Sequence, residues 1–139
     1  MITDIINYLG FDGNCEQAFK FYEKALEGKI TGFFRYKDAP GDYQHSPEAA
    51  ERVMHVTLQV GDKFIQGGDA PMGMHKGHSG YCINIVTDNN EDADRFFAAL
   101  AEGGTINMPI SETFWAHRFG MLIDKFGVPW MVNHPKPMQ

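Results

Sequence analysis

Two stretches of the chain share one pattern of apolar and polar positions. Residues 16–28 read EQAFKFYEKALEG and residues 91–103 read EDADRFFAALAEG, which aligns them at a constant offset of 75. In both, apolar residues recur at i, i+4 and i+7, a spacing that predicts an α-helix with one buried face. Both end in a glycine, Gly28 or Gly103, which predicts a left-handed helix cap. Asn14 and, in the second stretch, Asn89 or Asn90 are the expected N-caps.

Strand-like runs surround both predicted helices in the same order. One run precedes each helix and three follow it; the runs are 5–11, 29–36, 52–60 and 63–66 in the first half and 81–87, 105–110, 117–123 and 130–133 in the second. Turn residues at 61–62 and at 124–127 separate the last two runs of each half. The chain is therefore expected to contain a duplicated βαβββ module, which makes the fold class α+β.

The length of 139 residues fits a single domain. We expect modules at 1–69 and 80–134, joined by a Gly- and Met-rich linker. Each module alone is small for a robust hydrophobic core, so the two are expected to form one domain over 1–139.

Composition and charge narrow the classes of function. Hydrophobic residues make up 43% and aromatic residues 13% of the chain, which indicates a packed core rather than disorder. The net charge is −6 and lysines and arginines are not clustered, which argues against nucleic acid as a partner. The sequence has no apolar run of about 20 residues, the length of a membrane span, and no secretory leader pattern. We therefore expect no membrane association and a cytoplasmic location with both cysteines reduced.

Several short motifs accompany the repeat. They are YLGF at 8–11, NCEQA at 14–18, MHV at 54–56, GGD at 67–69, ETFW at 112–115 and DKFGVPW at 124–130. With the tandem modules, they resemble the vicinal oxygen chelate superfamily, which includes glyoxalase I and bleomycin-resistance proteins, and most of all its PhnB-like branch. The resemblance implies that each module curls its sheet into a cup and that two cups surround one cavity. It also implies a homodimer.

Metal-dependent members of that superfamily hold an ion with four ligands, usually His and Glu, on the first and last strand of each module. In this chain those positions fall on Asn7, Gln66, Cys82 and Met131. Only Cys82 is a good anionic ligand. A shift of one residue offers Tyr8, Tyr81 or Ile83, and Val132, and a shift of two offers Asn84 and Asn133. None of these is better, so we expect no metal and no cofactor.

The amides at these positions suggest a different use. Asn7, Gln66 and Asn84 would contact a neutral or anionic small molecule in the cavity, with aromatic side chains supplying apolar area. The alternative is that they satisfy buried backbone groups at the sheet seam.

His55 is the candidate catalytic residue. If Val53, His55, Thr57 and Gln59 share one face of their strand, that face is polar. An imidazole there would act as a general base, because its pKa lies near neutral pH, and Asp69 would orient it. The alternative is a structural histidine bonded within the sheet.

Most further candidate site residues have two possible interpretations. Trp115 is predicted to form a wall or lid of the pocket, or else a core or dimer contact. Cys82 is either a thiol in the cavity or a small buried hydrophobic residue. Cys15 opens a helix, whose dipole favours a thiolate. Residues 72–78, MGMHKGH, suit a soft metal or form a mobile surface loop.

Three functions are compatible with these residues. The first is a metal-independent binding protein or enzyme of the glyoxalase-like class, whose ligand contacts Asn7, His55, Gln66, Asp69, Cys82 and Trp115. The second is a metal-dependent lyase, isomerase or dioxygenase that uses His55. The third is a protein that sequesters a drug or metabolite. PhnB-like chains have also been labelled methyltransferases, but this chain lacks a glycine-rich nucleotide turn followed by an acidic strand end.

Overall fold

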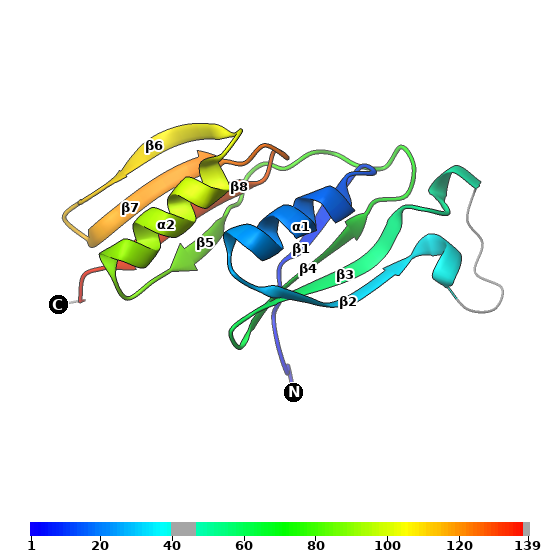
Figure 1. Cartoon of the computed structure of the whole chain (residues 1–139), viewed down its shortest axis with the longest axis horizontal. Helices are drawn as coiled ribbons and strands as arrows, with labels where there is room; N and C mark the ends of the chain where they lie inside the picture. Colours follow the sequence, from blue (N-terminus) through cyan, green and yellow to red (C-terminus); the bar gives the residue numbers. More distant parts are fainter. Residues whose placement is uncertain (40–46, 138–139) are drawn as a thin grey trace. The chain divides into compact units, whose positions relative to one another are not determined.

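The structure, a computed structural model, describes residues 1–39 and 47–137 and divides the chain into two compact units, Met1–Gly77 and His78–Gln139 (Figure 1). The first unit contains β1 (Tyr8–Phe11), α1 (Cys15–Ala25), β2 (Lys29–Arg35), the 3-10 turns η1 (Tyr36–Asp38) and η2 (Pro47–Ala49), β3 (Val53–Val60) and β4 (Lys63–Asp69). The second contains β5 (Ile83–Val86), α2 (Asn90–Ala101), β6 (Thr105–Ser111), β7 (Ala116–Ile123) and β8 (Pro129–Pro135).

The two units have the same topology. Each is a four-stranded sheet, with strand orders β1-β4-β3-β2 and β5-β8-β7-β6. The first pair in each order is parallel and the other pairs are antiparallel. The predicted α+β fold of two βαβββ modules is therefore confirmed. Within the described ranges, no helix is long and apolar enough to cross a membrane.

In the first unit, α1 buries an aromatic face against the sheet. Phe19 and Tyr22 are fully buried, above Leu9, Val56 and Leu58 of the strands. Gly67 of β4 makes this close approach possible, because a Cβ there would lie 2.6 Å from Cε1 of Phe19. Full burial of side chains of this size stabilises the fold by roughly 1.5–3 kcal/mol each.

In the second unit, an aromatic ring of the helix likewise packs on a glycine, but on a different strand. Phe97 of α2 lies over Gly120 of β7, where a Cβ would be 2.6 Å from Cε2 of Phe97. Leu100, Trp130 and Val132 complete the core and are fully buried. In both units an aromatic ring on the helix therefore packs on a strand position that only glycine can occupy without rearrangement.

The two helices end differently, although both were predicted to end at glycine. In α2 the prediction holds, because Gly103 has a φ of +73°. In α1 it is wrong, because Glu27 takes the left-handed conformation with a φ of +57°. Gly28 follows it and donates its N–H to the carbonyl of Glu23 at 3.0 Å, a Schellman-type closure. Gly28 is needed for another reason, since a Cβ there would lie 2.6 Å from the carbonyl oxygen of Gln59.

The helix N-termini also differ. The Asn89 side chain caps α2 as predicted, because its Oδ1 accepts the N–H of Asp92 at 2.7 Å. The predicted cap of α1 is wrong, since the side chain of Asn14 makes no capping hydrogen bond. Instead, Asp69 accepts the N–H of Cys15 at 3.1 Å. This cap is supplied from 54 residues away in the sequence.

The ends of three strands differ from the prediction: β1 and β5 are shorter than expected and β4 is longer. β1 begins at Tyr8 rather than residue 5, and β5 at Ile83 rather than residue 81. β4 continues to Asp69, beyond its predicted end at residue 66. The cause is the parallel ladder between β1 and β4, which begins at the pair Tyr8–Gln66 and ends at Phe11–Asp69.

Candidate functional site

The sheet of the first unit has one face covered by α1 and one face that α1 does not cover. Leu9 of β1 is buried under the helix, so its neighbour Tyr8 lies on the other face. Tyr8 pairs with Gln66 and Gln66 pairs with Thr57, which places both of these beside it. We call this surface the open face; its members are Tyr8, Phe34, His55, Thr57 and Gln66.

His55 lies on the open face in regular alternation with Thr57, and a register shift just before it turns Val53 to the other face. Arg35 pairs with Val53 while Phe34 pairs with His55, so Met54 is an additional residue in β3. Because of this bulge, Val53 is buried in the core, 1% exposed. The prediction that Val53 shares a face with His55 was therefore wrong, whereas His55 and Thr57 do lie together.

Hydrogen bonds fix the His55 ring. Its Nε2 lies 3.0 Å from Oγ1 of Thr57, and that oxygen accepts a longer bond of 3.5 Å from Nε2 of Gln66. The tautomer of the His55 ring decides whether its Nε2 donates to this hydroxyl or accepts from it.

Aromatic rings flank the imidazole. Phe34 is stacked on His55 with ring centroids 5.6 Å apart and an interplanar angle of 25°. Tyr8 lies on another side at 5.9 Å and 39°. Both are unusually open for large side chains, since Phe34 is 42% and Tyr8 55% exposed. The open face therefore presents apolar ring surface next to an imidazole.

The hydrogen bond of the Tyr8 hydroxyl needs the space that a neighbouring glycine, Gly68, leaves. The hydroxyl donates to the carbonyl oxygen of Met54 at 3.2 Å. A Cβ on Gly68 would lie 2.7 Å from that oxygen and 2.8 Å from the hydroxyl itself. Partial burial raises the pKa of the Tyr8 phenol above its ordinary value, and the neighbouring Cys15 and Tyr36 add to the rise. Tyr8 is therefore a neutral phenol at physiological pH.

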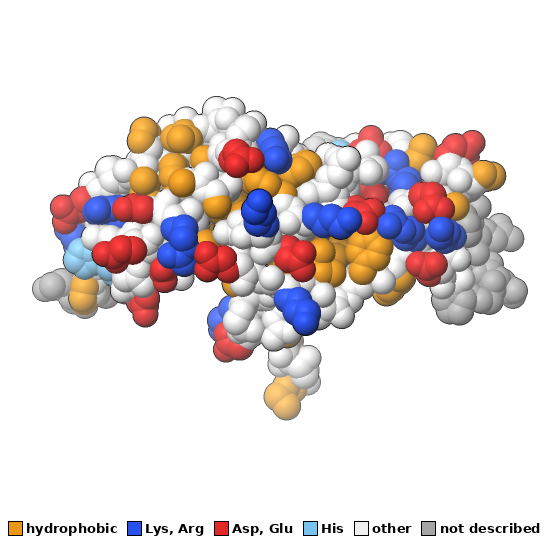
Figure 2. All heavy atoms as spheres, viewed as in Figure 1, with side chains coloured by type: hydrophobic (Ala, Val, Ile, Leu, Met, Phe, Trp, Pro, Cys, Tyr) orange, Lys and Arg blue, Asp and Glu red, His pale blue; other side chains and the backbone are white. Residues whose placement is uncertain are grey.

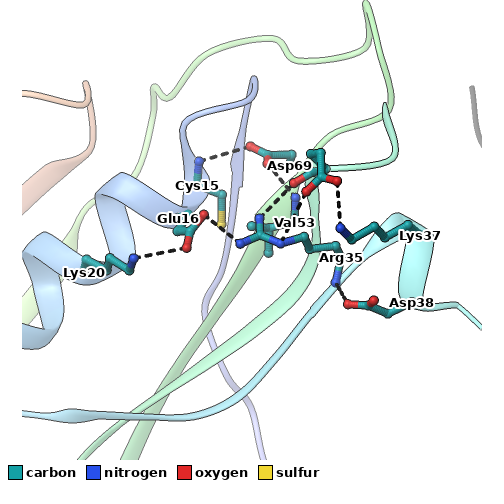
Figure 3. A network of polar contacts seen from close by, with 9 residues as sticks. Cys15, Glu16, Lys20, Arg35, Lys37, Asp38, Val53 and Asp69 are labelled. Carbon is teal, nitrogen blue, oxygen red and sulfur yellow. Dashed lines mark hydrogen bonds and ion pairs between the residues drawn. The ribbon is translucent and has the colours of Figure 1, made fainter. Parts of the chain in front are cut away.

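A network of charged side chains of this unit lies near the N-terminus of α1 (Figure 3). Glu16 bonds to Lys20 and to Arg35, each at 3.1 Å. These bonds, that of Lys20 first, lower the pKa of the Glu16 carboxyl. Lys37 is held by Glu51 at 2.7 Å. Over both helices, acidic and basic side chains are likewise interspersed (Figure 2). The five members of the open face include no charged residue.

Asp69 is a structural cross-link. It is 4% exposed, and its Oδ1 accepts the N–H groups of Gly13 at 2.7 Å and Cys15 at 3.1 Å. Its Oδ2 accepts the N–H of Val53 at 2.8 Å, which ties α1 to β3 (Figure 3). The expectation that Asp69 orients His55 is corrected, because strand alternation places Asp69 on the helix-covered face, opposite Gln66.

The same carboxylate changes the chemistry of Cys15. The thiol is fully buried. Burial, followed by the negative charges of Asp69 and Glu16, raises the pKa of Cys15 far above its ordinary value. The expected stabilisation of a thiolate by the helix dipole is therefore outweighed, and Cys15 is a neutral core side chain.

Asn7 lies next to the open face by its backbone only. Its carbonyl accepts the N–H of Gln66 at 3.0 Å. Alternation along β1 puts Asn7 in phase with Leu9, on the side opposite Gln66. Tyr8, which a one-residue shift along the sequence offers, is the residue that shares a face with Gln66.

The remaining predicted residues belong to the second unit. Cys82 lines a largely apolar hollow of about 450 Å³ with Tyr81, Met121, Trp130 and others. Trp115 is 43% exposed and has edge contacts with Phe114 and Phe119, at 4.8 and 5.4 Å. Of the six predicted site residues, the structure brings together His55 and Gln66.

Sequence reasoning missed Phe34 as a site residue. Its signal was the adjacent pair Phe33-Phe34, because two neighbouring aromatic residues in a strand point to opposite faces. Phe33 pairs with buried Val56, which leaves Phe34 on the open face beside His55.

The donors on the open face do not fit the usual metal of the resembled superfamily. They are a phenol, a hydroxyl, an amide and one imidazole, of which only His55 is a common ligand for zinc or nickel. Within 1–39 and 47–137, no three His, Cys, Asp or Glu side chains are grouped so as to hold an ion.

Comparisons with known proteins place this geometry in a family. The model of a family described as 3-demethylubiquinone-9 3-methyltransferase matches residues 3–133. Protein YjdN of Escherichia coli is 34% identical over 134 residues, which cover 91% of each chain.

Solved structures with a similar fold include members of the same family. Protein PA1353 from Pseudomonas aeruginosa has 37% identity and a TM-score of 0.88, covering 96% of this chain and 98% of its own. A PhnB protein from Bacillus cereus has 25% identity and a TM-score of 0.78, covering 95% and 99%. A glyoxylase/bleomycin resistance protein/dioxygenase domain from Frankia shares the fold, with a TM-score of 0.67 at 11% identity over 98% of each chain.

Proposed function

The chain belongs to the family described as 3-demethylubiquinone-9 3-methyltransferase, in the PhnB-like branch of the vicinal oxygen chelate superfamily, and on that premise we propose that it binds a small, uncharged, planar molecule on the open face. The proposal includes that binding needs no metal ion. The observation that carries it is the position of His55, between two exposed aromatic rings and a chain of neutral hydrogen-bonding groups.

The rings favour a planar ligand. Phe34 and Tyr8 expose much of their surface, and an aromatic contact with each is worth about 0.5–1.5 kcal/mol beyond the area it buries. Stacking is compatible with the Phe34–His55 geometry, in which the two planes differ by 25°. A flat ligand that covers this surface would remove the largest exposed apolar area of the face from water.

The polar groups favour an uncharged ligand. His55 offers its second ring nitrogen, Nδ1, and Gln66 offers an amide oxygen and a second N–H. Burying a charged ligand against such neutral groups would leave its charge without a counter-ion, which is costly. Charged partners such as Arg35 and Lys37 already have carboxylate partners, in Glu16 and Glu51.

Two outcomes are open once the ligand is bound. Histidine is the side chain that most often acts as a general base, so His55 could take this role. However, its partner is the Thr57 hydroxyl rather than a carboxylate, and a hydroxyl stabilises an imidazolium less well. This observation favours sequestration of the ligand over catalysis, the second candidate function.

Methyl transfer is not part of the proposal. The two sheets have the order β1-β4-β3-β2 and its counterpart, which differs from the doubly wound parallel sheet whose glycine-rich turn binds a nucleotide cofactor. The contacts predicted at Asn7, Asp69, Cys82 and Trp115 are not tested and are not part of this open-face proposal, and the homodimer stays a predicted assembly.

The test uses the full chain and three probes that share a phenyl ring. Benzamide, benzoate and phenylphosphonate are titrated separately at neutral pH and followed by NMR. We expect benzamide to bind most tightly and His55→Gln to weaken it at least about 10-fold. His134→Gln, a matched change in the second unit, leaves benzamide binding unchanged. Tighter binding of the two anions, or benzamide binding that ignores His55→Gln, contradicts the proposal.

The metal-free part is tested separately. Elemental analysis of the purified protein after dialysis is expected to find substoichiometric metal. A full equivalent of zinc, nickel, iron or manganese that is lost on His55→Gln would overturn it in favour of the metal-dependent alternative.

A further inference from the structure

Two histidines meet at one end of the ladder between β7 and β8. The ring centroids of His117 and His134 are 4.7 Å apart, with an interplanar angle of 44°. A register shift creates this contact, because Ala116 pairs with Pro135 while Arg118 pairs with His134. His117 is therefore an additional residue in β7, and the bulge turns its ring toward its neighbour on β8.

A hydrogen bond to helix α2 decides which nitrogen of the His134 ring carries the proton. Nδ1 of His134 lies 2.8 Å from Oδ1 of Asn90, the first residue of α2. An amide oxygen only accepts, so Nδ1 carries the proton and Nε2 of His134 keeps its lone pair. Metal-binding histidines have the same arrangement, with one nitrogen bonded to an oxygen acceptor and the other available to the ion.

The charges around the pair are balanced. Arg118 Nε lies 3.1 Å from Asp94, and Lys136 Nζ lies 3.0 Å from Glu112. The bond from Lys136 holds the pKa of the Glu112 carboxyl below its ordinary value. Both basic side chains near the histidines are therefore neutralised by carboxylates, so a cation at the pair meets little net repulsion.

We propose that His117 and His134 form a two-imidazole site for a borderline divalent transition ion, of which Zn²⁺, Ni²⁺ and Cu²⁺ are the candidates. Imidazole suits these ions, whereas Mg²⁺ and Ca²⁺ prefer oxygen ligands. Water fills the remaining coordination positions. With two protein ligands, the site exchanges its ion readily and differs from a structural four-ligand centre. It is independent of the open face, which lies in the first unit.

The experiment titrates the full chain with nickel chloride alone at pH 7.5, using calorimetry. We expect one equivalent to bind, and His117→Gln and His134→Gln each to weaken binding at least about 10-fold. Asn90→Ala, which removes the partner of His134 Nδ1, weakens it by about 10-fold. His55→Gln is the matched control and leaves the affinity unchanged. Acidifying the sample weakens binding, because protons compete with the ion for the same nitrogens.

Wild-type affinity in either histidine variant overturns the proposal, and so does affinity that rises as the pH falls. If the variants fail to fold, the wild-type protein still decides the question. Substoichiometric Cu²⁺ is added, and paramagnetic broadening of the histidine ring signals is followed by NMR. The signals of His117 and His134 are expected to broaden first. Broadening that begins at His55, His75 or His78 contradicts the assignment.

Discussion

Replacing Asp69 by asparagine tests whether its carboxylate holds the first unit together. Oδ1 accepts two backbone N–H groups and Oδ2 accepts the N–H of Val53 at 2.8 Å. In Asp69→Asn the amide oxygen can keep the first two bonds, but its NH₂ group then faces the Val53 donor. One hydrogen bond to a charged acceptor is lost, at about 2 kcal/mol, and two are weakened, at about 1 kcal/mol in total.

A loss of about 3 kcal/mol is large for a domain of this size. It corresponds to a melting temperature lower by roughly 10 °C. In urea, with a slope of about 2 kcal/mol per molar, the midpoint falls by about 1.5 M. The assay is urea unfolding followed by circular dichroism, together with amide hydrogen exchange at Val53 and Cys15. Both amides are expected to exchange faster in the variant.

Two matched variants serve as a positive and a negative control. Asp124 has the same geometry in the second unit, with Oδ1 bonded to the N–H groups of Phe126 and Val128 and Oδ2 to the indole of Trp130 at 2.8 Å. Asp124→Asn is expected to cost a similar amount. Asp62 is 88% exposed and its change to asparagine should cost less than about 0.5 kcal/mol. If Asp69→Asn behaves like Asp62→Asn, the cross-link argument is refuted.

Three further outcomes are expected. Gly68→Ala forces the Tyr8 hydroxyl away, because the new Cβ would lie 2.8 Å from it; we expect a loss of about 1–3 kcal/mol in urea unfolding and weaker benzamide binding, and unchanged binding would contradict the role given to Tyr8. Glu16→Gln should lower the free energy of unfolding by less than about 1 kcal/mol at pH 7. Because folding lowers the pKa of Glu16, this stabilisation is present above the ordinary carboxyl pKa of about 4.3 and is lost as the pH falls through the lowered value. A difference between the two proteins that persists at pH 2 would contradict this reasoning. In a thiol titration of the native protein at pH 8, half-exposed Cys82 should react and buried Cys15 only after unfolding; rapid modification of two thiols would contradict this.

The elements could be predicted from the sequence because periodicity is a local property. The offset of 75 aligned both helices, and it also aligns β1 with β5. What failed were the positions decided by distant contacts. The α1 cap comes from Asp69, and the left-handed residue is Glu27 because Gly28 must fit against Gln59.

The candidate site was predicted in part for the same reason. His55 was chosen because alternation places polar residues on one face of a strand, and Gln66 because the resemblance assigns a ligand position there. The bulge at Met54 was not visible, since an additional residue leaves the composition of a strand unchanged while it reverses the facing of everything beyond it. The bulge at His117, which brings its ring next to that of His134, could not be predicted from the sequence for the same reason.

The most direct test of the central claim is a protein-observed NMR map of benzamide binding to the full chain, with aromatic and backbone signals assigned. The account predicts that the largest shift changes fall on Tyr8, Phe34 and His55, with smaller ones on Thr57 and Gln66. Changes that centre instead on the hollow beside Cys82, or that spread over both units without a maximum, would contradict the claim that the open face is the binding site.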